Sequence, residues 1–206
     1  MSKKYKATIY FLTNNTHKYE EVKPIAEKYG FHIRMCKDVE KVEIQSNDLL
    51  EIAKYAALHA YTKINKPLMV EDAGLFVHAL NGFPGPYSSY VFKTIGYEGI
   101  LRLLKNSSNR EACFRSAVVL IYEPFIITCL EETTGTIITT PRGDKGFGFD
   151  PIFVPSGSSK TFAEMSINEK NMFSHRAKAV ECAFKKLEKM LELGLKTGIS
   201  NSIDDK

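Results

Sequence analysis

The sequence lacks the patterns that mark zinc ribbons, redox motifs and membrane spans. Its four cysteines lie far apart and form no CxxC pair; they are Cys36, Cys113, Cys129 and Cys182. We therefore expect buried free thiols in a reducing compartment. No segment approaches the roughly 18 consecutive apolar residues that a membrane-spanning helix needs. Partners in a membrane are not expected.

The sequence also lacks long blocks of one charge sign. The formal net charge is +4, with Lys and Glu interspersed, which suits a small anionic ligand better than a nucleic acid duplex. The basic residues 1–6 precede a short apolar run, Ala7 to Leu12, that contains Thr8 and leads to no small-residue cleavage site. We expect a cytoplasmic protein that binds a small molecule and no nucleic acid.

The composition is that of an ordinary globular chain, with 44% hydrophobic and 25% charged residues among 206. We expect one folding unit over residues 1–195 and a polar, frayed tail over 196–206. The periodicity predicts helices at Thr16–Tyr29, Asp48–Tyr61, Tyr97–Leu104 and Ser174–Leu193. It predicts strands at Lys6–Thr13, Phe31–Cys36, Pro67–Asp72, Glu111–Tyr122, Phe125–Glu131 and Thr133–Thr140, the last with a bulge at Gly135.

This order of elements predicts an α/β fold. Strands and helices alternate at both ends of the chain, and a run of strands lies between them. The central hairpin, with its turn at Glu123 and Pro124, has to be antiparallel. We therefore expect a mixed, twisted sheet flanked by helices, with a shaped Gly- and Pro-rich loop over Gly74–Tyr87.

The first candidate site lies in TNNTHK. Thr13 ends a predicted strand, and Asn15 and Lys18 begin the next helix, so side-chain donors, free backbone N–H groups and a cation meet at one point. Phosphate is the ligand that such a helix start binds. The GxxxxGK[ST] pattern of a P-loop is missing. The alternative is that Thr or Asn only caps the helix and Lys18 pairs with Glu20 or Glu21 in solvent.

The second candidate is the adjacent pair Glu71 and Asp72, which is predicted to end a strand with the two side chains on opposite faces. Strand ends are where α/β folds place their sites. The alternative is a pair of solvated loop acids. The shaped loop GFPGPY directly behind the pair favours a functional role.

Two further candidates follow near the C-terminal end. Phe147, Phe149 and Asp150 lie in GFGFDP, where aromatic rings on a loop offer a platform for a base, although both rings can instead fill the core. Ser174 can cap the last helix, which leaves His175 and Arg176 in its first turn. Cations are misplaced at a positive helix end, and this conflict is typical of a site for an anionic or carbonyl-rich ligand.

Together these segments resemble the family of inosine triphosphate pyrophosphatases, also called Ham1-like proteins, from Phe11 to about Ala179. TNNTHKYEEV resembles the family's TGNxxKxxE opening, EDAGLFVHALNGFPGPYSS its acidic and glycine-proline stretch, and GFGFDPIF its aromatic turn. FAEM followed by EKNMFSHRAKA resembles its closing signature. Asn14 stands where the family usually has glycine, and Asn is the residue that next best tolerates a positive φ.

The resemblance implies an elongated protein with two lobes around a long mixed sheet, a central cleft and a homodimer. It implies hydrolysis of ITP, dITP and XTP to the monophosphate and pyrophosphate, with Mg²⁺ as cofactor. Residues implied to hold the phosphates or magnesium are Thr13, Asn15, Lys18, Glu43 and Asp72, with Asp72 as base, Glu71 beside it and Lys170 near the phosphates and sugar. Residues implied to surround the purine are Phe149 as the stacking ring, Phe147, Asp150, Ser174, His175 and Arg176.

Two alternatives stay open. One is a Maf-like pyrophosphatase acting on modified pyrimidine nucleotides, which fits the GFGFDP and SHR segments less well. The other is a non-catalytic nucleotide- or RNA-binding module. Glu43, Glu71 and Asp72 argue against the latter, because a protein that only binds anions gains nothing from added negative charge unless a metal is present.

Overall fold

The computed structural model describes residues 5–197. Its helices are α1 (Thr16–Lys28), α2 (Leu49–Ile64), α3 (Ser88–Leu103), α4 (Ile167–Phe173) and α5 (His175–Thr197). Its strands are β1 (Thr8–Leu12), β2 (His32–Cys36), β3 (Leu68–Val77), β4 (Pro84–Gly85), β5 (Glu111–Tyr122), β6 (Phe125–Ile137) and β7 (Phe153–Pro155). Short 3₁₀ turns are η1 (His78–Leu80), η2 (Asp150–Ile152) and η3 (Phe162–Glu164).

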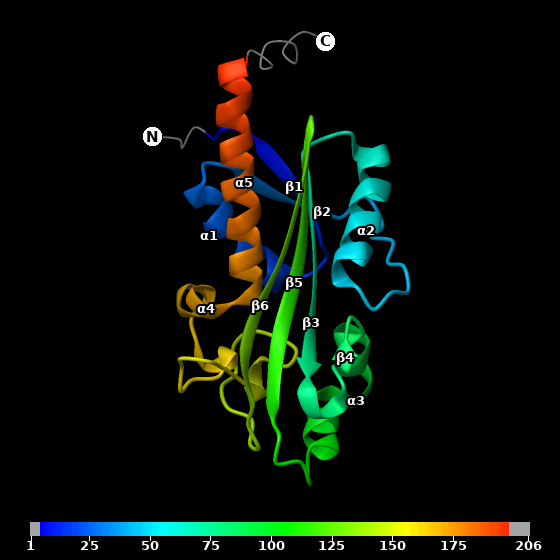
Figure 1. Cartoon of the computed structure of the whole chain (residues 1–206), viewed down its shortest axis with the longest axis vertical. Coiled ribbons are helices and arrows are strands. Elements are labelled where there is room, and N and C mark those ends of the chain that lie inside the picture. The colour runs from blue at the N-terminus through cyan, green and yellow to red at the C-terminus, as the bar shows by residue number, and fades with distance from the viewer. Residues whose placement is uncertain (1–4, 198–206) are drawn as a thin grey trace.

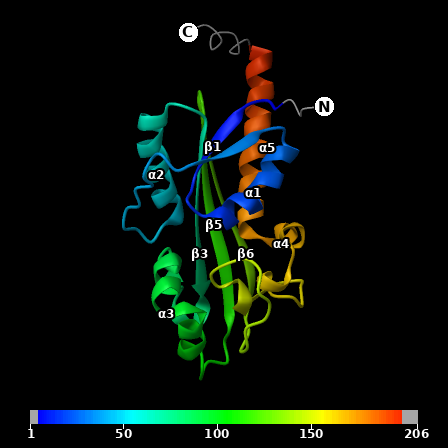
Figure 2. The same ribbon diagram turned by 180° about the vertical axis from the view of Figure 1, so that it is seen from behind.

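The strands form one mixed sheet in the order β2-β1-β3-β5-β6-β7, with β4 also paired to β3. β1 is parallel to β2 and β3, whereas the β3, β5, β6 and β7 neighbours are antiparallel. Figures 1 and 2 show α1 and α5 on one face of the sheet and α2 and α3 on the other. The predicted mixed sheet flanked by helices is confirmed.

The packing follows from the residues on each helix face. On α2, four alanines point inward and pack against β1, β3 and β5; they are Ala53, Ala56, Ala57 and Ala60. Small side chains let a helix approach a sheet closely. On the opposite face, Val22 of α1 and Phe184 of α5 pack with Phe11 of β1 and Phe31 beside β2. A third cluster, with Phe153 and Phe162, fills the far end of the sheet.

Three predicted element boundaries are wrong. Most of Gly74–Tyr87 is regular, because β3 continues to Val77 in register with β5, and β4 folds back onto it. A Cβ on Gly74 would lie 2.2 Å from the Gly85 carbonyl oxygen, so glycine permits that close pairing. The start of α3 at Ser88 was missed: the helix is interrupted at Gly96, whose φ of 66° is non-helical, and only its second part coincides with the helix predicted at Tyr97–Leu104.

The third error concerns the strand predicted at Thr133–Thr140. β6 runs without interruption from Phe125 to Ile137, and Gly135 pairs in register with Ala112 and Pro155, so there is no bulge. A Cβ at Gly135 would lie 2.3 Å from the Val154 carbonyl oxygen. Glycine is therefore needed here for the close approach of β7.

The prediction of four free thiols is wrong for two of them. Cys129 of β6 and Cys182 of α5 form a disulfide, with their Cα atoms 6.2 Å apart. The two residues meet because α5 packs along β6, a tertiary contact that the spacing in sequence does not reveal. Cys36 and Cys113 are free and buried as expected.

At the C-terminal end α5 extends to Thr197, two residues past the expected domain limit. The rest of the expected frayed tail, 198–206, lies outside the described residues. Within residues 5–197, none of the helices has the length and apolar content needed to cross a membrane.

Candidate active site

A cavity of about 700 Å³ opens where the strand pairing along one edge of β3 is interrupted. On that edge β1 pairs with β3 at Leu68 and Met69, and β4 pairs with it at Leu75 and Phe76. The segment 70–74 between these pairings faces the cavity. Most of the predicted site residues line it: Thr13, Asn15, Lys18, Glu43, Glu71, Asp72, Phe147, Phe149, Asp150, His175 and Arg176.

The start of α1 forms one wall of this cavity. Asn15 caps the helix, since its Oδ1 accepts a hydrogen bond from the Lys18 backbone N–H at 3.2 Å, and the Thr13 hydroxyl accepts one from Asn15 N–H at 3.1 Å. Capping and ligand binding are therefore not alternatives here, because the capped helix start itself faces the cavity. Asn14 is not among the described residues with a positive φ, so replacing glycine there strains nothing.

Glu71 and Asp72 lie in the middle of β3, not at its end as predicted. Their side chains do leave opposite faces: Glu71 reaches Lys18 of α1 and Arg176 of α5, whereas Asp72 reaches Lys41, in the segment before α2. Both nevertheless line one cavity, because the gap in strand pairing gives access to both sides of β3. Side chains from opposite faces of one strand therefore contribute to the same site.

Asp72 belongs to a small group of charges at the cavity mouth. The Lys41 ammonium lies 2.6 Å from Glu43 Oε1 and 3.6 Å from Asp72 Oδ1. Burial raises the pKa of Asp72 above its ordinary value, more than the Lys41 and Lys18 charges lower it. A carboxylate with a raised pKa is a better proton acceptor, which suits Asp72 to the role of general base.

Behind the cavity lies a buried chain of alternating charges. Lys170 contacts both Asp150 and Glu21, and Arg176 contacts both Glu21 and Glu71. Glu71 accepts a further hydrogen bond from the Ser116 hydroxyl at 2.7 Å, and the Lys18 ammonium lies 2.8 Å from its other oxygen. Each buried charge thus has at least one partner of opposite sign, as buried charges require.

The pKa values in this chain follow from burial opposed by the neighbouring charges. Burial would raise the pKa of Glu71, but Arg176 and Lys18 outweigh it and hold that pKa well below its usual range. The same balance lowers the pKa of Glu21, through Arg176 and Lys170. For Asp150 burial prevails over Lys170, and its pKa is raised.

The first turn of α5 does not carry the unbalanced cations that the sequence indicated. Ser174 caps the helix, with its hydroxyl accepting from the Ala177 N–H at 3.3 Å. Burial and the Arg176 charge lower the pKa of His175 well below 6.5, so its imidazole is neutral at pH 7, and it stacks on Phe114 with ring centroids 4.7 Å apart. Glu21 and Glu71 offset Arg176. Internal acids therefore resolve the electrostatic conflict.

The two aromatic rings both line the cavity but differ in burial. Phe149 is 3% exposed and meets Phe92 edge-on, whereas Phe147 is half-buried and stacks on His17 with ring centroids 5.5 Å apart. The Lys170 ammonium and the Arg176 guanidinium both lie over the Phe147 ring. Phe147 is therefore the more exposed ring but already contacts His17 and two cations, and the stacking role of Phe149 stays a prediction.

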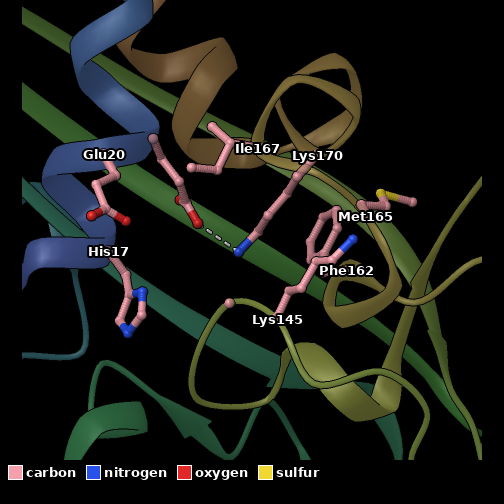
Figure 3. A pocket seen from close by; sticks show the side chains of 9 residues that line it. His17, Glu20, Lys145, Phe162, Met165, Ile167 and Lys170 are labelled. Carbon is pink, nitrogen blue, oxygen red and sulfur yellow. Dashed lines mark hydrogen bonds and ion pairs between the residues drawn. The ribbon is translucent and has the colours of Figure 1, made fainter.

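Two predicted residues do not line the main cavity. Ser174 is fully buried at the cap of α5, and Lys170 lies behind the Phe147 ring. Lys170 instead lines a smaller cavity of about 230 Å³ between α1 and the loop at Lys145. Figure 3 shows Lys170 crossing this space toward α1, where its ammonium contacts Glu21 at 2.7 Å, with His17 and Glu20 on one side and Lys145 on the other.

The sequence reasoning gave no site role to Glu21, Lys41 or Ser116. A signal existed for Glu21, which shares the inward face of α1 with Ile25, four residues away, where an acid is unexpected. Lys41 lies in an irregular segment with no periodicity to place it. Ser116 lies on a β-strand whose other inward residues are apolar, and the sequence alone does not show that Glu71 needs a donor there.

The formal charges that line the main cavity balance. Four cations and four acids face it: Lys18, Lys41, Lys93 and Arg176, and Glu43, Glu71, Asp72 and Asp150. A polyanionic ligand therefore enters a site with no surplus of positive charge, although each cation can be shared with it. This is the arrangement expected where a bound metal ion supplies the missing charge.

Solved structures with this fold are known. The chain superposes on the Ham1 protein of Staphylococcus aureus with a TM-score of 0.73 and 29% identity, covering 90% of this chain and 98% of that one. A HAM1 protein from Coxiella burnetii gives a TM-score of 0.74 at 27% identity, covering 91% and 99%.

Sequence comparison gives higher identities. The chain is 51% identical over 171 residues to a protein named dITP/XTP pyrophosphatase from Hyperthermus butylicus, covering 83% of this chain and 90% of the relative. It is 49% identical over 175 residues to a protein of the same name from Methanopyrus kandleri, covering 84% and 92%. The family model described as Ham1 family matches residues 9–186, and we conclude that the chain belongs to the Ham1 family.

Proposed function

We propose that this protein hydrolyses non-standard purine nucleoside triphosphates, namely ITP, dITP and XTP, to the monophosphate and pyrophosphate, and thereby clears them from the nucleotide pool. Relatives at about 50% identity are named dITP/XTP pyrophosphatase. The observation that carries the proposal is that one cavity combines a capped helix start, a partly buried acid at its mouth and an aromatic ring beside Arg176. These groups would bind the phosphates, activate the attacking water and contact the nucleobase, respectively.

The cavity suits a nucleotide in size and polarity. Its volume of about 700 Å³ falls within the range of small-molecule sites. The triphosphate would lie at the start of α1, where Thr13, Asn15 and Lys18 supply donors and a cation. The nucleobase would lie in the part of the cavity lined by the turn Phe147–Phe149 and by the first turn of α5, with His175 and Arg176.

The donor set fits Mg²⁺. Among residues 5–197 no group of three or more acids, histidines or cysteines is placed to hold an ion. The cavity mouth does offer two carboxylates, Glu43 and Asp72, already drawn to one cation, Lys41. Mg²⁺ is commonly held by one or two carboxylates together with substrate phosphates and water. Bound there, it would supply the positive charge that the triphosphate needs.

We assign the activation of water to Asp72. Its carboxylate would accept the proton while the water oxygen forms a bond to the α-phosphorus, and the bond from that phosphorus to the bridging oxygen breaks, so pyrophosphate leaves. Lys18 would offset charge on the phosphates as it shares its ammonium with Glu71. Glu71 itself is too strongly engaged, with Arg176, Ser116 and Lys18, to act as the base.

The nucleobase would be selected through the group at its position 6. Inosine and xanthosine present a carbonyl there, whereas adenine presents an amino group. Arg176 has five N–H donors, and its contacts with Glu21 and Glu71 leave others for the carbonyl. Against adenine those donors would remain unpaired, at about 1–3 kcal/mol per group.

Release of pyrophosphate tests the proposal. The protein would be incubated with ITP, dITP, XTP, ATP, dATP, dGTP, modified pyrimidine triphosphates and single-stranded RNA, with and without Mg²⁺. We expect rapid release only from ITP, dITP and XTP, and only with Mg²⁺. Asp72→Asn should abolish turnover while leaving nucleotide binding intact, and Arg176→Ala should lower the ITP/ATP preference. Turnover of modified pyrimidine triphosphates would favour the Maf-like alternative, and binding without any turnover would favour the non-catalytic binding module.

We also propose a homodimer. α3 and the turn before it expose several large apolar side chains: Phe83, Tyr87, Tyr90, Ile95 and Leu103. Large apolar side chains exposed along one segment are typical of a surface that a protein partner covers. Tyr90, at 69% exposed, is the most accessible of them. Light scattering should give twice the chain mass for the wild type and the chain mass for Tyr90→Glu; a monomeric wild type would refute the dimer.

A further inference from the structure

Lys41 lies between the two acids to which we assign the magnesium ion. Its ammonium is 2.6 Å from Glu43 Oε1 and 3.6 Å from Asp72 Oδ1. The side chain comes from the irregular segment 37–48 between β2 and α2, and it is 19% exposed. A single positive charge thus engages both carboxylates.

Lys41 differs from the other paired cations of the cavity. Arg176 is fixed between Glu21 and Glu71 within the protein interior, and Lys18 pairs with a fully buried Glu71. The main partner of Lys41, Glu43, has a side chain that is 57% exposed. An ion pair in contact with solvent separates at little cost, and lysine has a flexible four-carbon stem with three donors.

A divalent ion and the Lys41 ammonium cannot both stay on these acids without strong repulsion at short range. If a metal ion displaced Lys41 in the absence of nucleotide, the Lys41 ammonium would have no anionic partner. When a triphosphate arrives with the metal, about four negative charges enter a cavity whose own charges balance, and Lys41 gains a new anionic partner. Displacement is therefore favourable only when metal and nucleotide enter together.

We propose that Lys41 is an exchangeable counter-ion that couples metal binding to nucleotide binding. In the free protein it holds Glu43 and Asp72 in the place of a divalent ion, and in the substrate complex it moves to the phosphates. Lys41 is therefore a positioning and binding residue that keeps metal affinity low until nucleotide is present. This inference rests on the proposed function, because it assumes that a metal and a triphosphate share the cavity.

Metal titration of the nucleotide-free protein tests the idea independently of turnover. Mn²⁺ would be titrated into the full chain, with free Mn²⁺ followed by electron paramagnetic resonance, alone and with a non-hydrolysable ITP analogue. For Lys41→Met we expect Mn²⁺ to bind the free protein at least about fivefold more tightly, and the gain in Mn²⁺ affinity caused by the analogue to shrink by a similar factor. The KM for ITP should rise more than kcat falls.

Two further variants serve as controls. Lys41→Arg keeps the charge and should keep the coupling, whereas Lys37→Met removes an exposed cation from the same segment, outside the cavity lining, and should change neither affinity. Far-UV circular dichroism confirms that each variant is folded, and Lys41→Gln replaces Lys41→Met if the latter is not. Unchanged or weaker Mn²⁺ binding without nucleotide in the charge-removing variant would overturn the proposal. A wild type that releases no pyrophosphate from ITP would refute the proposed function instead, since the Mn²⁺ titration needs no turnover.

Discussion

Replacement of Glu21 by Gln should reveal how far the buried charges depend on one another. The chain of Lys18, Glu71, Arg176, Glu21, Lys170 and Asp150 contains three cations and three acids. Glu21→Gln keeps the shape of the side chain but leaves one buried positive charge without compensation. Breaking a buried pair in this way costs about 3–5 kcal/mol of the free energy of unfolding.

The double variant separates a charge effect from a packing effect. In Glu21→Gln with Arg176→Met, the network is neutral again, and each remaining ion keeps one partner: Lys170 keeps Asp150, and Lys18 keeps Glu71. The double variant should therefore be less destabilised than the sum of the two single variants by at least about 2 kcal/mol.

Guanidinium unfolding at pH 7, followed by far-UV circular dichroism, measures both quantities. The exposed pair Lys28 and Glu181 joins the same two helices, α1 and α5, so Lys28→Met is the matched control and should change stability far less. Additive effects of Glu21→Gln and Arg176→Met, or a Glu21→Gln cost no greater than that of Lys28→Met, would refute the reasoning.

Three other perturbations have defined outcomes. Reduction of the Cys129–Cys182 disulfide, or Cys182→Ser, should lower the free energy of unfolding by about 4 kcal/mol, because the bond closes a loop with a sequence separation of 53. An unchanged midpoint of denaturant unfolding would contradict this. His175 stays neutral in the folded protein, because burial lowers its pKa. Below pH 6.5 the unfolded chain therefore binds a proton that the folded chain does not. The free energy of unfolding should fall by about 1.4 kcal/mol for each pH unit below 6.5. His175→Asn should show a correspondingly smaller slope, and equal slopes in both proteins would argue against a neutral imidazole. Asn15→Ala should lower the free energy of unfolding by about 1 kcal/mol, because the helix cap is lost, and should raise the KM for ITP. Asn15→Asp should keep the cap but still weaken phosphate binding. Equal KM values for the wild type and both variants would place the phosphates elsewhere.

The sequence predicted the fold where local signals and packing agree. The helix at Thr16–Tyr29 and the hairpin around Glu123 and Pro124 were found because apolar periodicity, caps and turn residues all pointed the same way. The extent of β3 was missed, since glycine and proline after Asp72 suggested a loop. In the protein those same residues let β4 approach β3 closely.

At the site, sequence motifs identified which residue types gather but not how they pair. Eleven of the thirteen predicted residues line one cavity, yet no local pattern indicated that Lys170 lies over an aromatic ring or that Glu21 lies between two cations. Partners 149 and 155 positions apart cannot be read from local pattern. The Cys129–Cys182 disulfide was not predicted for the same reason.

The continuous strands limit how this molecule can move. β5 and β6 run along much of the length of the protein, and β3 runs beside the cavity, each without a break, so within residues 5–197 unbroken strands connect the two ends of the sheet (Figure 1). A rigid-body hinge of the kind seen in two-domain binding proteins has no pivot here. Capture of a ligand would instead depend on the segment 37–48, the turn around Phe147 and a change in the twist of the sheet itself, and hydrogen exchange should find those peripheral segments far more dynamic than the central strands.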